Sequence, residues 1–289
     1  MKCLGAGLLL LALAACQPPV TDGAADDVDA QPQPAAADSH PAGSRVARSE
    51  AALWRVSRYE QLQHAAQEAG APFGVLLLGA SGTEVCVLDT ISLEKLHGAY
   101  RDDPGLTLSL AELRAFQARF CPAEKPLDRR EAERVEMQRR IEAGDADALL
   151  ISALLEADEQ MDHEDRHALR LAAERTSAET RSPAVFEALQ ILLLEATFFD
   201  PAKVIDRPLG MDDEALRDAW GHAVLLARCE RFGGCGPGSL MVYRMCMPQH
   251  CRRGLDVRGY VRDQLSRDGY EEAQRRARQW LVTNRRKAA

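Results

Sequence analysis

From residue 50 onward, apolar side chains recur every three to four residues, and this spacing constrains the fold more than any other feature. Residues at that spacing share one face of an α-helix. The most apolar segment, Pro183–Phe199, opens with a proline, which suits a first helical turn, and we expect it to be central. Leu149, Leu150, Leu154 and Leu155 form a second stripe within 145–159. Further helices are expected at 50–68, 109–120, 127–143, 164–176, 212–232, 240–247 and 270–283. The sequence predicts an all-α protein.

One stretch departs from this pattern: residues 72–90 read PFGVLLLGASGTEVCVLDT. Two short β-prone runs flank Ala80, Ser81 and Gly82, which are typical of a turn. The stretch is not the G-x-S-x-G elbow of hydrolases, because the serine lies one residue too near the second glycine. Two interpretations stay open: a small β-hairpin near 73–89, or a buried apolar segment leading into the next helix.

The N-terminus, MKCLGAGLLLLALAACQPP, has the parts of an export signal. Lys2 precedes an apolar run from Gly5 to Ala12, which is too short to span a bilayer. The residues LAAC, which end at Cys16, resemble a bacterial lipobox. The resemblance implies cleavage before Cys16, lipidation of its sulfur, and anchorage by the acyl chains. A plain secretory signal with A-x-A cleavage near Ala14 is the alternative.

The residue after the cysteine bears on localisation. Gln17 is not aspartate, and by resemblance to the sorting rule of enteric bacteria this implies the outer membrane, facing the periplasm. Residues 16–49 are rich in Pro, Ala, Asp and Gln and contain no aromatic residue. Such a segment buries too little apolar surface to offset the entropy of ordering, so we predict a disordered tether. As a coil it reaches on the order of 30 Å.

Six of the eight cysteines follow the predicted anchor, and an even number in an exported protein indicates disulfides. Cys86 and Cys121 stand apart from the rest, so we pair them. The other four are spaced C-x5-C-x10-C-x4-C, which by itself allows three connectivities. We favour Cys229–Cys235 and Cys246–Cys251. A zinc site is the competing interpretation, although zinc knuckles prefer a C-x2–4-C spacing.

Residues 163–167 read HEDRH, the H-E-x-x-H pattern of zinc peptidases. In such an enzyme His163 and His167 would bind zinc, and Glu164 would activate water. The two residues between Glu164 and His167 are charged, however, where that family has uncharged residues. Asp162 is a natural N-cap, and acidic residues complement a helix start. We therefore predict no catalytic residue, metal or cofactor, and keep the zinc peptidase as an alternative.

Residues Gly144–Leu149 loosely resemble the start of a Sel1-like or tetratricopeptide-type helical repeat. The resemblance covers residues 144–235. The resemblance implies antiparallel helical hairpins stacked into a short solenoid. The cysteine-bearing C-terminal half is similar to uncharacterised proteobacterial exported proteins, which implies no function. We divide the chain into a signal peptide (1–15), the tether (16–49), an N-terminal subdomain (50–126) and a helical-hairpin domain (127–289).

The formal net charge of −8 disfavours nucleic acid as a partner. Stacked hairpins expose an extended surface suited to a protein or peptide. The leading hypothesis is a non-enzymatic lipoprotein that is anchored in the outer membrane and acts as an interaction module, either an envelope scaffold or an inhibitor of a toxin or hydrolase. The alternatives are the zinc peptidase and a structural spacer of the envelope.

Overall fold

The computed structural model describes residues 50–287, except 51, 57, 69, 88–103, 125, 127–128, 158–160, 199–207, 209 and 247–255. At 104–110, 130, 163 and 283–287 it describes the backbone alone. The predicted signal peptide and tether lie outside the described residues. All described residues belong to one compact unit, Ser44–Ala289.

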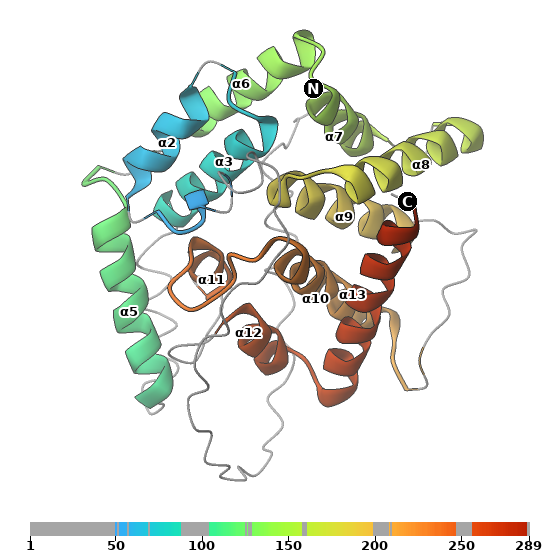
Figure 1. Ribbon diagram of the computed structural model, residues 1–289. Coiled ribbons are helices and arrows are strands. Elements are labelled where there is room, and N and C mark those ends of the chain that lie inside the picture. The colour runs from blue at the N-terminus through green and yellow to red at the C-terminus, as the bar shows by residue number, and fades with distance from the viewer. Residues whose placement is uncertain are drawn as a thin grey trace, which may run out of the picture. The chain divides into compact units, whose positions relative to one another are not determined.

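Every regular element in these described ranges is an α-helix (Figure 1). In chain order the helices are α2 (Tyr59–Gln67), α3 (Phe73–Val87), α5 (Pro104–Phe120), α6 (Arg129–Glu142), α7 (Ala146–Glu156), α8 (His163–Glu179), α9 (Pro183–Phe198), α10 (Asp213–Phe232), α11 (Leu240–Cys246), α12 (Val257–Gln264) and α13 (Arg267–Lys287). The predicted all-α class is confirmed.

Helices α6 to α10 form the stacked hairpins, because each contacts the next along the chain. Between α6 and α7 the chain reverses at Gly144, whose φ of +77° lies in the left-handed region that favours glycine. Asp145 then caps α7 by accepting hydrogen bonds from the backbone nitrogens of Asp147 and Ala148. Helix α13 returns along α10 and closes this part of the fold (Figure 1).

The β-hairpin considered for residues 73–89 is wrong, since Phe73–Val87 form the single helix α3. The glycines that indicated a turn are packing positions instead. A Cβ on Gly82 would lie 2.6 Å from Leu62 Cδ2, and one on Gly79 would lie 3.0 Å from Ala66 Cβ. Leu62 and Ala66 belong to α2, so the missing side chains let α2 approach α3 closely.

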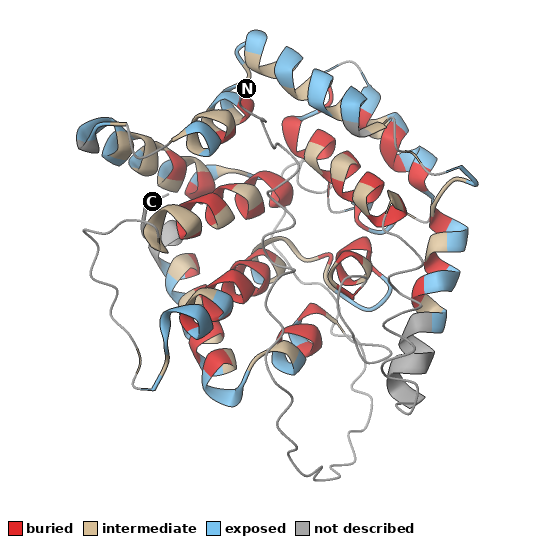
Figure 2. Cartoon of the chain, turned by 180° about the vertical axis from the view of Figure 1, so that it is seen from behind, coloured by how far each residue is buried: buried red, intermediate tan, exposed pale blue. Residues whose placement is uncertain are grey.

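A single large apolar core joins the two predicted subdomains, 50–126 and 127–289. The rings of Phe116 and Tyr243 stack with their centroids 3.7 Å apart, and Phe120 stacks on Phe116 at 4.9 Å. Helices α9 and α10 are mostly buried, whereas no described side chain of α6 is buried (Figure 2). The stack therefore has an inner side of α9 and α10 and an outer side that includes α6.

Candidate interaction site

Large aliphatic side chains are exposed on several helices of the hairpin stack. Among the described residues, the exposed large hydrophobic side chains are Val135 (56 % exposed), Leu149 (43 %), Leu155 (45 %), Leu171 (42 %) and Val282 (51 %). The first four lie on α6, α7 and α8, which contact one another in sequence, and we name these four residues the α6–α8 surface. No aromatic residue is among them.

Helix α7 explains this exposure, because its sequence ADALLISALLE is apolar around most of its circumference. Only Ala148 and Ile151 are buried. The predicted stripe of leucines does not form the buried face: Leu149 and Leu155 are exposed, and Leu150 and Leu154 are half-buried. A helix that is apolar nearly all round needs cover on more than one side. Helices α6, α8 and α9 contact α7, yet Leu149 and Leu155 stay exposed in the described part of the fold.

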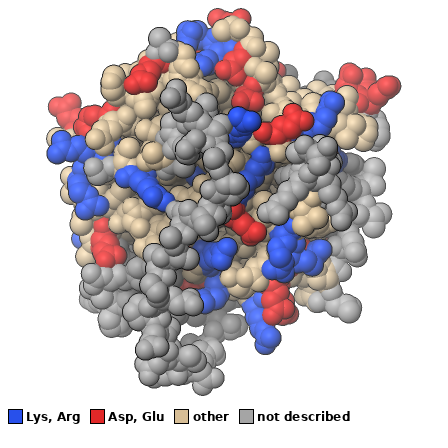
Figure 3. All heavy atoms as spheres, in the orientation of Figure 1, with Lys and Arg blue, Asp and Glu red and all other residues tan. Residues whose placement is uncertain are grey.

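Charged residues of α6 lie beside this aliphatic surface. Arg139 and Arg140 pair with Glu136 at 2.6 and 2.9 Å. The hydrogen bond from Arg139, followed by that from Arg140, lowers the pKa of Glu136 to about 2 despite partial burial. Over the face of the molecule seen in Figure 3, acidic and basic residues are interspersed rather than gathered into one basic patch.

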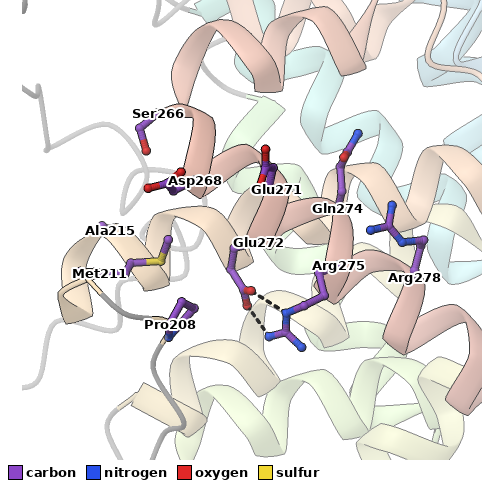
Figure 4. A pocket seen from close by; sticks show the side chains of 11 residues that line it. Pro208, Met211, Ala215, Ser266, Asp268, Glu271, Glu272, Gln274, Arg275 and Arg278 are labelled. Atoms are coloured by element: carbon purple, nitrogen blue, oxygen red, sulfur yellow. Dashed lines mark hydrogen bonds and ion pairs between the residues drawn. The ribbon is translucent and has the colours of Figure 1, made fainter.

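A pocket of about 830 Å³ lies between the chain entering α10 and the first half of α13 (Figure 4). Asp268 and Glu271 line one part of it, and Arg275 and Arg278 line another. Glu272 lies between them and receives two hydrogen bonds of 2.7 Å from Arg275. The pocket is therefore acidic toward one end of α13 and basic toward the other.

Glu272 also joins the pocket to the core. The indole Nε1 of Trp220, on α10, donates a 2.8 Å hydrogen bond to Glu272 Oε1. Burial alone would raise the pKa of Glu272, but the hydrogen bonds from Arg275 and Trp220 outweigh it and hold that pKa below its usual range. This carboxylate is thus committed to internal contacts.

The interior of the fold contains an ionic cluster that the sequence analysis did not predict. Glu187 of α9 accepts a hydrogen bond from Arg244 Nη2, and its Oε2 lies 3.2 Å from Arg228 Nε. The Arg228 guanidinium lies over the Trp54 ring, 4.1 Å from its centroid. Arg228 is fully buried, and burial lowers its pKa to about 10. Because the cluster is sealed from solvent, we assign it a structural role.

Glu50 completes this ionic cluster at the point where the described chain begins. Its side chain is buried, and its Oε1 accepts a hydrogen bond from the backbone nitrogen of Ala184 in the first turn of α9. Burial raises the pKa of Glu50, while the hydrogen bonds from Ala184 and Ser182 and the charge of Arg228 oppose that rise.

Two of the predicted disulfides are confirmed. Cys86 and Cys121 are bonded with their Cα atoms 5.4 Å apart, and Cys229 and Cys235 with theirs 5.6 Å apart. The bonded pair Cys229–Cys235 holds no free thiolate for the zinc site that was the competing interpretation. Cys246 is also disulfide-bonded.

The other predicted partner and the predicted lipidation site, Cys251 and Cys16, lie outside the described residues. Their pairing and lipidation stay predictions.

The HEDRH residues lie at the start of α8, which begins at His163. Asp162 caps this helix, as predicted, and its Oδ1 accepts a 2.9 Å hydrogen bond from the nitrogen of Asp165. Glu164 and His167 are exposed. Within the described ranges, no three His, Cys, Asp or Glu side chains are grouped so as to hold a metal ion. The prediction that the protein is neither a metalloprotein nor an enzyme stays a prediction.

No family model, curated protein or solved structure matches this chain. None of the helices in the described ranges is both long enough and apolar enough to span a bilayer.

Proposed function

We propose that this protein is a lipid-anchored envelope protein that binds a protein partner through the α6–α8 surface. The observation that carries the proposal is that four of the five exposed large hydrophobic side chains among the described residues lie on three consecutive, contacting helices. Single exposed apolar residues are common on any protein, whereas exposed apolar side chains concentrated in one region mark an interaction surface. A partner with an aliphatic docking face, rimmed by charges that complement those of α6, fits this surface.

The sequence supports the anchored part of the proposal. The lipobox-like residues before Cys16 supply the lipid, and residues 16–49 supply a tether long enough to hold the folded unit away from the membrane. Two closed disulfides agree with an oxidising compartment such as the periplasm. The predicted outer-membrane location rests on Gln17.

Crosslinking in intact cells tests the binding surface. A photoreactive residue is placed at Ser152 on α7, and adducts are compared between the unchanged chain and the variant Leu149→Asp/Leu155→Asp. We expect a discrete adduct with another protein that is lost in the variant. Val282→Asp is the matched control, because Val282 is at least as exposed as Leu149 and Leu155 but lies on α13. An adduct that persists in the double variant, or one formed with a second copy of this chain, would contradict the proposal.

The anchor is tested separately by Cys16→Ser. We expect the lipid label and the outer-membrane fractionation of the protein to be lost together. The two alternatives predict other outcomes: a structural spacer gives no adduct at all, and a zinc peptidase retains about one zinc per chain that His163→Ala removes. No specific observation favours either alternative.

A further inference from the structure

We propose that the pocket between α10 and α13 binds an extended peptide segment of four to five residues that carries a positive charge at one end and a negative charge at the other. The pocket shares no lining residue with the α6–α8 surface. The inference therefore stands or falls independently of the function proposed above.

The spacing of charges along α13 sets the length of this ligand. Asp268 and Arg278 both line the pocket, ten positions apart on one helix. A helix rises 1.5 Å per residue, so their Cα atoms are about 15 Å apart along the axis. An extended peptide advances about 3.3–3.6 Å per residue, so four to five residues span the same distance. A mono- or dipeptide is too short to reach both ends.

The available charges lie at the ends of the pocket, whereas those between them are already paired. Glu272 is bonded to Arg275 and Trp220, and Glu271 lies 3.1 Å from Arg267. Neither Asp268 nor Arg278 makes an ion pair or hydrogen bond within the part of the chain that the structure describes.

Figure 4 shows these two side chains at opposite ends of the lining set. A ligand that forms an ion pair with each of these two side chains must itself carry one positive and one negative charge.

The rest of the lining suits a peptide backbone between the charged ends. Gln274 lies between Asp268 and Arg278 on α13, and its amide is able both to donate and to accept a hydrogen bond. Pro208, Met211 and Ala215 supply an apolar wall at the entrance to α10. A peptide backbone with small side chains is able to bond to the Gln274 amide and to pack against the apolar wall. A polyanion such as a nucleic acid meets the carboxylates of Asp268 and Glu271, which disfavour it.

Calorimetry on the full chain in detergent micelles tests the proposal with three capped pentapeptides: acetyl-Lys-Ala-Ala-Ala-Glu-amide, its dilysine analogue and its diglutamate analogue. We expect the bipolar peptide to bind at least about fivefold more tightly than either analogue, the equivalent of one surface ion pair. Equal affinity for all three peptides, or no binding of the bipolar peptide, would overturn the inference.

Charge reversal sharpens the test. In Arg278→Glu the preference should switch to the dilysine peptide, and in Asp268→Lys it should switch to the diglutamate peptide. Both residues are exposed, so the variants should fold, which an unchanged unfolding temperature verifies. Arg258→Gln, an exposed arginine on α12 outside the pocket, is the matched control and should leave the order of affinities unchanged. A reversal variant that keeps the wild-type order would also overturn the inference.

Discussion

Glu50 Oε1 accepts a 2.8 Å hydrogen bond from the backbone nitrogen of Ala184, a residue 134 positions away in the sequence. The nitrogens of a first helical turn have no partner inside their own helix, so α9 needs acceptors from elsewhere. Ser182 Oγ accepts from Val185, and the Glu50 carboxylate accepts from Ala184. The residue that follows the predicted tether is thereby fixed to the central helix of the stack.

Close packing around Glu50 makes Gly74 intolerant of any side chain. A Cβ at this position would lie 2.0 Å from Ser182 Oγ and 2.6 Å from Glu50 Oε2. We expect Gly74→Ala to lower the free energy of unfolding by about 2–3 kcal/mol, as overpacking of a core does, measured by urea denaturation. Gly236→Ala is the control, because no atom lies within 4 Å of its added Cβ. Equal stability of the two variants would show that the α3–α9 contact is looser than described.

The raised pKa of Glu50 predicts a pH dependence with a definite sign. Below its ordinary value of 4.5 the carboxyl is protonated in both folded and unfolded chains. As pH rises from 4.5 through the folded pKa, only the unfolded chain loses its proton, so the Glu50 contribution to stability falls.

Glu50→Gln keeps the acceptor for Ala184 but removes this titration. We therefore expect the stability of the variant relative to wild type to increase between pH 4.5 and pH 8, measured by chemical denaturation at each pH. Parallel curves over that range would contradict the pKa shift. The other carboxyl groups are common to both proteins, so their contributions cancel in the difference.

Among the residues that the structure describes, Glu187 is the only carboxylate in direct ion-pair contact with both Arg228 and Arg244. Glu187→Gln preserves the shape of the side chain but leaves two buried guanidinium groups without that negative charge. We expect a loss of about 3–5 kcal/mol in the free energy of unfolding, as for other broken buried pairs. Glu131→Gln breaks an exposed pair with Arg134 and should leave the stability nearly unchanged. If the two variants have the same free energy of unfolding, the charges of the buried cluster do not contribute to stability.

The two closed disulfides should differ in their effect on stability. Cys86 and Cys121 are 35 positions apart, whereas Cys229 and Cys235 are 6 apart. The loop-entropy model assigns about 4 kcal/mol to the longer link and about 2 kcal/mol to the shorter. We expect the Cys86→Ala/Cys121→Ala pair to lose more stability in urea than the Cys229→Ala/Cys235→Ala pair. The reverse order would mean that the shorter disulfide supports α10 by more than loop closure.

Reasoning from the sequence failed where a local signal had two physical causes. The glycines of α3 are equally typical of a turn and of close helix packing, and only the position of Leu62 against Gly82 decides between them. The leucines of α7 are a second example, because their spacing predicts a helix but does not show whether another helix covers them. A usable signal for the ionic cluster did exist: Glu187 and Arg228 each interrupt an otherwise apolar helical run.

Local features of this protein were determined by the sequence. Helix periodicity, the Asp162 cap and the start of α9 at Pro183 depend on residues within about one helical turn of each other. The pairing of Cys86 with Cys121 followed from their isolation in the chain. Tertiary structure alone decided which helices meet, that Glu50 reaches Ala184, and that the α6–α8 surface stays exposed. The reason is physical: burial and charge pairing depend on distances in space, and local sequence patterns do not specify the distances between residues that are far apart in the chain.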